Sequence, residues 1–223
     1  NDFLALKISY MNDIANLCEL VGENIEDVAK GMSYDDRIGS NFLKAGIGYG
    51  GSCFPKDTKA LKYLAKQNGY RLRTVEAAVE VNSEQKTKLY KKASDRLITF
   101  NGLKVAVLGL AFKPGTDDLR EAPSLENVEL LLKQGAKVYA YDPVAEENFK
   151  KKYPTEITYV KNPIEALKKA NVCFIYTEWN EIKAIKPEEY KKLMKTPLVY
   201  DGRNIYDLKD MKDAGVEYYS IGR

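Results

Sequence analysis

The chain has 223 residues, 35 of them basic and 32 acidic, and a formal net charge of +3 at pH 7. A charge this balanced, with the basic residues dispersed, argues against nucleic acid or an anionic membrane as the main partner. The chain has no histidine, which excludes Cys-His and Ser-His-Asp catalysis and a histidine-ligated metal.

Helices are predicted for the start of the chain. Apolar residues recur at a spacing of three and four over 1–21, and Gly22 supplies a stop. Asn24 suits the N-cap of a second helix, which we expect Gly31 to end.

A glycine-rich segment then interrupts the helical pattern over 33–52, and we expect this loop to cradle a ligand. Pro55 suits the first turn of the next helix, which should run to Gln67. A longer helix is predicted from Thr74 to Ile98. At about 25 residues it would span roughly 37 Å, a length typical of helices that pack across a dimer.

From Asn101 onward, short strands rich in Val, Ile or Tyr alternate with helices. This alternation predicts βαβ units and a mainly parallel sheet. Ligands bind beyond the carboxyl ends of such strands, so the turns after Leu108, Tyr176 and Tyr200 should carry function. The expected strands are 104–109, 137–141, 157–160, 172–176, 198–200 and 217–220, and the expected helices are 125–134 after a Ser124 cap, 163–169 and 187–194.

Cys53 lies between the glycine-rich loop and a helix start. Unpaired N–H groups at a helix start favour an anion, and Lys56 adds a positive charge. Asp57 lies four residues on and could act as the base that hydrolyses an adduct on the sulfur. The alternative is an inert core cysteine, which is what the apolar surroundings of Cys18 and Cys173 predict for those two residues.

The run from Gly48 to Asp57, Gly-Tyr-Gly-Gly-Ser-Cys-Phe-Pro-Lys-Asp, resembles the active-site signature of the nucleotide-sugar dehydrogenases. The resemblance covers essentially the whole chain, and several ordered motifs are far more specific than one glycine pattern. The other motifs that resemble the family are Asn1 to Lys7 with Asn12 in its central helix, Asp36-Arg37-Ile38-Gly39 and Phe42-Leu43-Lys44 in its substrate loop, and Gly109 to Lys113 and Asp201-Gly202-Arg203 in its C-terminal domain.

The resemblance implies an α/β protein. A helical central dimerisation domain, residues 1–100, would precede a Rossmann-like, mainly parallel α/β domain, residues 101–223, that binds a UDP-sugar. The family also has an N-terminal NAD-binding domain with a G-x-G-x-x-G turn, and the nearest candidate, 105–113, has one glycine where three are needed. We therefore expect the central and C-terminal parts of a longer enzyme, inactive alone, and a homodimer formed through the central helices.

The family's reaction is the oxidation of a nucleotide sugar's primary alcohol in two NAD-dependent steps. Phe54 favours UDP-glucose as the substrate, giving UDP-glucuronate for polysaccharide biosynthesis. Cys53 would attack the intermediate aldehyde, giving a thiohemiacetal and then a thioester. Asp57 would activate or position the hydrolytic water, and Asn1 would hydrogen-bond the oxyanion or the water. The lysine that shares this task in the family precedes Asn1 and lies outside the chain.

Binding residues are implied as well. The loop from Lys44 to Gly50 would offer backbone N–H groups to the nucleotide sugar. Arg37 would be donated to the neighbouring subunit's site, and Lys56 and Arg120 would lie near NAD. The expected substrate-binding residues are Arg37, Lys44, Ala45, Gly46, Ile47, Gly48, Tyr49, Gly50, Phe112, Lys113 and Arg203, and no metal ligand is expected.

Other interpretations stay open. A dehydrogenase for GDP-mannose or a UDP-N-acetylhexosamine differs only in its substrate, whereas a non-catalytic nucleotide-sugar-binding or dimerisation module, or a structural helical protein with an inert cysteine, belongs to another class. Three widely spaced cysteines give no disulfide framework, which favours a reducing compartment. No apolar run approaches the ~20 residues needed to cross a bilayer, and we expect a cytoplasmic protein.

Overall fold

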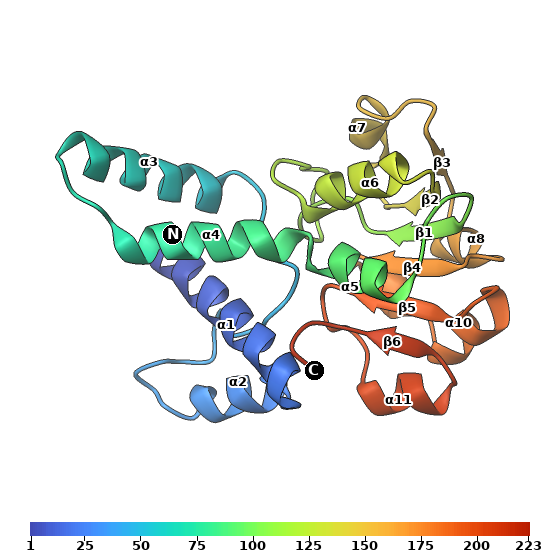
Figure 1. The fold of residues 1–223 in the computed structure, drawn as a ribbon, viewed down its shortest axis with the longest axis horizontal. Helices are drawn as coiled ribbons and strands as arrows, with labels where there is room; N and C mark the ends of the chain where they lie inside the picture. The colour runs from blue at the N-terminus through green and yellow to red at the C-terminus, as the bar shows by residue number, and fades with distance from the viewer.

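The computed structural model describes residues 1–223, with a helical half followed by a sheet half (Figure 1). In the helical half α1 buries Ala5, Ser9, Asn12 and Ala15 along one face and packs mainly on α4. The spacing of these positions is the three-and-four pattern that predicts the helix. The helices of this half are α1 (Asp2–Val21), α2 (Ile25–Ser33), α3 (Cys53–Gln67), α4 (Arg73–Lys86) and α5 (Lys88–Arg96).

Two of the three expected helix boundaries around α1 and α2 are confirmed. Gly22 ends α1 in a left-handed conformation with φ 77°, and the Asn24 side chain caps α2 by accepting from Glu26 N–H at 3.0 Å. The prediction that Gly31 ends α2 is wrong. Gly31 does not have a positive φ, so it continues the helix instead of turning out of it, and α2 ends at Ser33.

The single helix predicted over 74–98 is also wrong, because α4 and α5 are separate helices that meet at Thr87. Asn127 of α6 (Pro123–Lys133) donates its Nδ2–H to the carbonyl oxygen of Lys86 at 2.7 Å. A carbonyl engaged by a side chain in this way is diverted from the helical ladder. The length argument for a dimer therefore does not hold, and the dimer rests on the family resemblance.

The sheet half contains one six-stranded parallel sheet with strand order β3-β2-β1-β4-β5-β6. Val105 of β1 pairs with Val138 on one side and Val172 on the other, so the chain reverses direction across the sheet at β1 and β4. The predicted parallel α/β fold is confirmed, and so is each predicted strand, to within one residue at either end. The strands are β1 (Lys104–Leu108), β2 (Lys137–Tyr141), β3 (Ile157–Tyr159), β4 (Val172–Ile175), β5 (Leu198–Asp201) and β6 (Glu217–Tyr219).

Helices flank this sheet (Figure 1). Asn162 caps α8 (Pro163–Leu167) as its Asn-Pro sequence suggests, by accepting from Glu165 N–H at 3.0 Å. Ser124 is not a cap: it lies inside α6, where its buried hydroxyl donates to the Leu110 carbonyl at 2.5 Å. Beyond α6 the helices are α7 (Glu146–Lys150), α8 (Pro163–Leu167), α9 (Asn180–Lys183), α10 (Pro187–Leu193) and α11 (Leu208–Asp213). None of the helices combines the length and apolar character needed to span a membrane.

A continuous hydrophobic core joins the two halves, and it includes Met11, Ile47 and Leu89 together with the central strands. The expected boundary at residue 100 falls between α5 and β1 and stays a prediction.

The last residues of the chain return to the helical half. Gly222 accepts from Ile25 N–H at 2.8 Å and donates to Glu19 Oε1 at 2.7 Å, while the Arg223 guanidinium lies 2.9 Å from Glu26 Oε2. The two halves are thus connected both through the covalent chain and through residues 220–223.

Candidate active site

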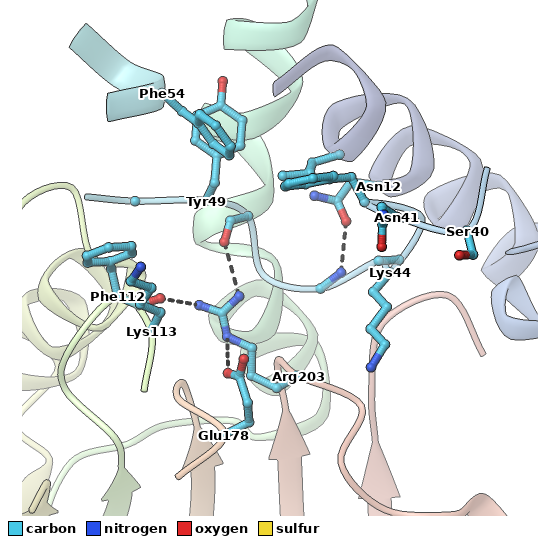
Figure 2. Close-up of a pocket in the computed structure, with 16 residues that line it drawn as sticks. Asn12, Ser40, Asn41, Lys44, Tyr49, Phe54, Phe112, Lys113, Glu178 and Arg203 are labelled. Atoms are coloured by element: carbon cyan, nitrogen blue, oxygen red, sulfur yellow. Dashed lines mark hydrogen bonds and ion pairs between the residues drawn. The ribbon is translucent and has the colours of Figure 1, made fainter. Parts of the chain in front are cut away.

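The loops that follow β1, β4 and β5 meet the glycine-rich segment around a cavity of about 480 Å³ (Figure 2). Phe112 and Lys113 come from the first loop, Glu178 from the second and Arg203 from the third. These are the three turns at the carboxyl edge of the sheet that the strand pattern selects. The remaining lining residues are Ile8, Asn12, Ser40, Asn41, Phe42, Lys44, Ala45, Gly46, Gly48, Tyr49, Gly50 and Phe54.

Arg203 is the polar centre of this cavity (Figure 2). Its Nε donates to the Tyr176 carbonyl at 2.8 Å, its Nη2 to the Phe112 carbonyl at 3.0 Å and its Nη1 to the Gly48 carbonyl at 3.3 Å. Glu178 Oε2 lies 3.3 Å from Nε, so the charge is partly compensated. Burial lowers the pKa of Arg203 and Glu178 opposes that effect, but a guanidinium stays protonated. The side chain therefore joins the glycine-rich segment to two loops of the sheet half.

The loop that carries Arg203 is fixed by Asp201, a fully buried carboxylate at the end of β5. Its Oδ1 accepts from Arg203 N–H at 2.8 Å, and its Oδ2 accepts from Ile205 N–H at 2.8 Å and from Tyr218 Oη at 2.7 Å. Burial raises the pKa of Asp201, and these three donors oppose the rise. The motif Asp-Gly-Arg is thus a buried support followed by an arginine that lines the cavity.

Three buried amides from the helices hold the glycine-rich segment. Asn82 of α4 accepts from Tyr49 N–H at 2.8 Å and donates to the Tyr49 carbonyl at 3.1 Å. Asn12 of α1 accepts from Gly46 N–H at 2.9 Å, and Gln85 of α4 donates to the Gly46 carbonyl at 2.8 Å. The loop conformation is therefore set by side chains that are distant in sequence.

Only some of the backbone N–H groups in this loop are free to bind a ligand. The N–H groups of Gly46, Ile47 and Tyr49 already donate inside the protein, to Asn12, Gly202 and Asn82. The residues of 44–50 whose N–H groups make no hydrogen bond within the chain, and which line the cavity, are Lys44, Ala45, Gly48 and Gly50.

Two expected substrate residues lie away from the cavity. Ile47 is a fully buried core residue. The Arg37 side chain is 89% exposed and pairs with Asp35 at 2.6 Å beside the outer face of α1. Its expected role is in a neighbouring subunit's site, which a single chain does not test, so that role stays a prediction.

Cys53 is the first residue of α3 and is exposed, whereas Cys18 and Cys173 are buried in the core as predicted. Cys53 is not among the cavity-lining residues, but its neighbour Phe54 is. Phe54 packs edge-on against Tyr49 with ring centroids 5.5 Å apart. The helix start that carries the sulfur thus borders the cavity.

Asp57 lies one turn into α3 and accepts a hydrogen bond from Asn1 Nδ2 at 2.5 Å. The Lys56 ammonium lies 3.7 Å from the other carboxylate oxygen. The Asn1 hydrogen bond, and to a smaller extent Lys56, lowers the pKa of Asp57. The structure therefore brings Asn1, from the start of the chain, together with Lys56 and Asp57 at the end of α3 where Cys53 lies.

Arg120 lies in a second surface hollow, with residues 116–119 and Asn148. Its guanidinium pairs with Asp118, with Nη2 to Oδ2 at 2.7 Å, and its carbonyl accepts from Gly51 N–H at 2.7 Å. It is therefore attached by its backbone to the segment that leads to Cys53. No three His, Cys, Asp or Glu side chains are placed to hold a metal ion.

Glu178 and Asn12 line the cavity although the sequence predicted no binding or catalytic role for either residue, and Phe42, which was expected in the substrate loop, lines it with Ser40 and Asn41. Glu178 follows Tyr176 in a turn that was expected to carry function, so an acidic residue at that point was an available signal. Asn12 offered a weaker one, as an amide on the apolar face of a helix.

A six-stranded parallel sheet in this order, with a cavity at its carboxyl edge, defines a Rossmann-like α/β protein of the kind found in dehydrogenases. Residues 1–84 match the central domain of the UDP-glucose/GDP-mannose dehydrogenase family, and residues 106–208 match the UDP binding domain of the same family. The chain belongs to the UDP-glucose/GDP-mannose dehydrogenase family.

Among individual proteins, the UDP-glucose 6-dehydrogenase YwqF of Bacillus subtilis is 48% identical over the whole chain, which covers 51% of that relative. A UDP-glucose dehydrogenase structure from Pyrobaculum islandicum superposes with a TM-score of 0.87 at 35% identity, covering 98% of this chain and 48% of that one. An NDP-N-acetyl-D-galactosaminuronic acid dehydrogenase from Methanosarcina mazei gives a TM-score of 0.87 at 29% identity, covering 100% and 49%. The chain spans about half the length of the curated relatives it matches.

Proposed function

We propose that this chain is the nucleotide-sugar-binding and nucleophile-bearing part of a UDP-glucose 6-dehydrogenase, which oxidises UDP-glucose to UDP-glucuronate with NAD. The observation that carries the proposal is an exposed cysteine at the first position of α3, with a hydrogen-bonded carboxylate one turn further on and a cavity beside it. Relatives named UDP-glucose 6-dehydrogenase, 48% and 46% identical over the chain, support UDP-glucose as the substrate.

The cavity suits a nucleotide sugar in size and charge. Its volume of about 480 Å³ falls among ordinary small-molecule sites. Two of its cations, Lys44 and Lys113, take part in no ion pair, whereas Arg203 is opposed by Glu178. A diphosphate would therefore lie against the two lysines and the unbonded N–H groups of Lys44, Ala45, Gly48 and Gly50. Arg203, Phe112 and Gly46 would shape the wall around the ligand.

Cys53 would act on the aldehyde that the first oxidation produces. Its Sγ bonds to the carbonyl carbon as the C=O π bond opens, the proton of the thiol passes to the carbonyl oxygen, and a thiohemiacetal forms. NAD, when bound, supplies the hydride acceptor for both oxidations. A thioester on Cys53 then requires a water molecule, which adds to the acyl carbon and releases the sulfur.

Asp57 is suited to holding that water. A carboxylate with the ordinary pKa of aspartate is already ionised at neutral pH, and the Asn1 hydrogen bond lowers the pKa of Asp57 further, so the group can accept a hydrogen bond from water. Asn1 would orient the carboxylate and could also donate to the oxyanion.

Lys56 and Arg120 are the residues that would meet NAD. Both are exposed cations close to the Cys53 segment, which fits contact with an anionic dinucleotide, although Arg120 is already paired with Asp118. The division of the chain at residue 100 into a central domain and a UDP-sugar-binding domain belongs to the same proposal.

A homodimer is part of the proposal as well. The outer face of α1 exposes the large apolar side chains of Phe3, Tyr10, Leu17 and Leu20, and apolar residues gathered on one helix face in this way favour a protein contact. Arg37 lies beside this face, as it must to reach a partner's cavity. A cytoplasmic location is proposed from the family and from the unpaired cysteines.

The decisive variant is Cys53→Ser in the intact protein. We expect glucuronate formation to fall by at least a thousandfold while UDP-glucose binding, measured by calorimetry, stays within threefold. Unchanged turnover would exclude the thioester route. Running GDP-mannose and a UDP-N-acetylhexosamine in parallel tests the substrate, and binding without any turnover in the wild type would favour the non-catalytic module.

A further inference from the structure

The loop between β1 and α6 packs directly on the two glycines that precede Cys53. Gly51 N–H donates to the Arg120 carbonyl at 2.7 Å. A Cβ added at Gly50 would lie 2.5 Å from the Glu121 carbonyl oxygen, closer than real side chains come to a backbone oxygen. The backbone at 120–121 therefore sets the path of the chain as it enters the Cys53 helix.

The Glu121 side chain holds two helices of the other half at the same time. Its Oε1 accepts from Lys59 of α3 at 2.8 Å, and its Oε2 accepts from Lys86 of α4 at 2.7 Å. The Lys86 side chain is only 5% exposed, and its nearest other carboxylate, Glu126, is 3.6 Å away. A buried ammonium needs a close counter-charge, so Glu121 is the main partner that makes the burial of Lys86 tolerable.

Glu121 pays for this arrangement in its backbone. It has φ 55°, a left-handed conformation that is strained for a non-glycine residue. Such strain persists where surrounding contacts over-determine it, and it concentrates at functional sites. The two ion pairs, one to α3 and one to α4, are the contacts that hold the residue there.

We propose that Glu121 is a positioning residue for Cys53, an inference that rests on the proposed function. Its backbone fixes the glycines before the cysteine, and its side chain fixes α3 beyond it through Lys59. Glu121 does not line the cavity. Its loss should therefore slow the covalent steps on Cys53 without weakening the binding of the nucleotide sugar.

The test is Glu121→Gln in the intact protein, which keeps the shape of the side chain and removes its charge. We expect kcat to fall at least tenfold while KM for UDP-glucose stays within twofold. The matched control is Glu129→Gln, which removes an exposed glutamate of α6 paired with Lys133 and should leave both constants unchanged. A kcat within twofold of wild type, or a rise in KM that accounts for the loss, would overturn the role.

A second variant covers the case in which Glu121→Gln does not fold. Lys59→Gln removes the ion pair between Glu121 and α3 and leaves the pair with Lys86. Because the Lys59 side chain is 65% exposed, this variant should fold normally. We expect at least a threefold change in the rate at which iodoacetamide alkylates Cys53, and a wild-type rate would refute the positioning role. Alkylation needs no turnover, so it tests the positioning role of Glu121 independently of the proposed function. An inactive wild-type protein would refute only the proposed function.

Discussion

Asn82 hydrogen-bonds both backbone groups of Tyr49, accepting from its N–H at 2.8 Å and donating to its carbonyl at 3.1 Å. A carboxamide is a short side chain that offers a donor and an acceptor together. The neighbouring Gly48 adopts φ +92°, and a Cβ there would lie 2.8 Å from Asn82 Oδ1. The turn at the centre of the cavity wall therefore depends on one amide of α4.

Replacing that amide should damage both stability and binding. Asn82→Ala leaves two buried backbone groups without partners, and we expect the free energy of unfolding to fall by about 2–4 kcal/mol. UDP-glucose affinity should drop about tenfold, because a misplaced loop loses roughly one or two hydrogen bonds to the ligand. Urea unfolding and calorimetry measure the two effects. Asn68→Ala removes an exposed amide at the end of α3 whose side chain bonds only to the Leu64 carbonyl, and it should change neither quantity.

Two glycine-to-alanine substitutions should change the free energy of unfolding in opposite directions. Gly50→Ala would place a Cβ against the Glu121 carbonyl and should destabilise the protein by about 1–3 kcal/mol. Gly31→Ala adds a methyl group in open space inside α2 and should stabilise it by about 0.5–1 kcal/mol. Thermal and urea unfolding of the two variants decide the matter. A destabilised Gly31→Ala would show that this residue needs a conformation other than helix.

Arg203→Lys separates charge from geometry at the cavity. Lysine keeps the positive charge, but one ammonium cannot reproduce a planar fork that serves the carbonyls of Tyr176, Phe112 and Gly48. We expect a loss of about 1–3 kcal/mol in stability and a rise of about tenfold in the Kd for UDP-glucose. Arg96→Lys, at an exposed pair with Glu217, is the control and should cost under about 1 kcal/mol. Wild-type affinity in Arg203→Lys would mean that only the charge matters.

The ion pairs of Glu121 with Lys59 and Lys86 should make the free energy of unfolding depend on pH below about 4.5. Hydrogen bonds from Lys59 and Lys86 lower the pKa of Glu121 from 4.5 to about 2. A carboxyl with a lowered folded-state pKa stabilises the protein fully above pH 4.5 and loses that contribution as pH falls towards 2. Allowing for its partial exposure, wild type should exceed Glu121→Gln by about 1–2 kcal/mol at pH 6, with the gap closing below pH 4.5. Urea unfolding from pH 6 to pH 3 measures it, and a gap independent of pH would contradict the assignment.

Local pattern was sufficient to predict the sheet and the edge that carries the cavity. Each strand is a short run rich in β-branched or aromatic residues, as in Val172 to Ile175, and its short length and composition favour a strand over a buried helix. Parallel strands then bring the turns after Leu108, Tyr176 and Tyr200 to one edge. Cys53 could be assigned to a helix start from Pro55 and the preceding glycines alone.

The features that were missed depend on contacts between distant segments. The break at Thr87 involves an amide of α6 that lies far along the chain, and no property of residues 74–98 reports it. Serine is a residue type that favours N-caps, but the Ser124 hydroxyl donates to the Leu110 carbonyl instead. Glu178 became part of the site through Arg203. Helix propensity and capping rules describe neighbours in sequence, and tertiary partners override them.

The contacts of residues 220–223 with α1 and α2 limit how far the two halves of the protein can move apart. A hinge needs a single flexible attachment between two bodies, whereas here Gly222 and Arg223 anchor the end of the sheet half to α1 and α2, apart from the covalent linker, which leaves α5. Swinging the halves apart would break these contacts and open a shared core. The two halves therefore hold the walls of the cavity at a fixed separation.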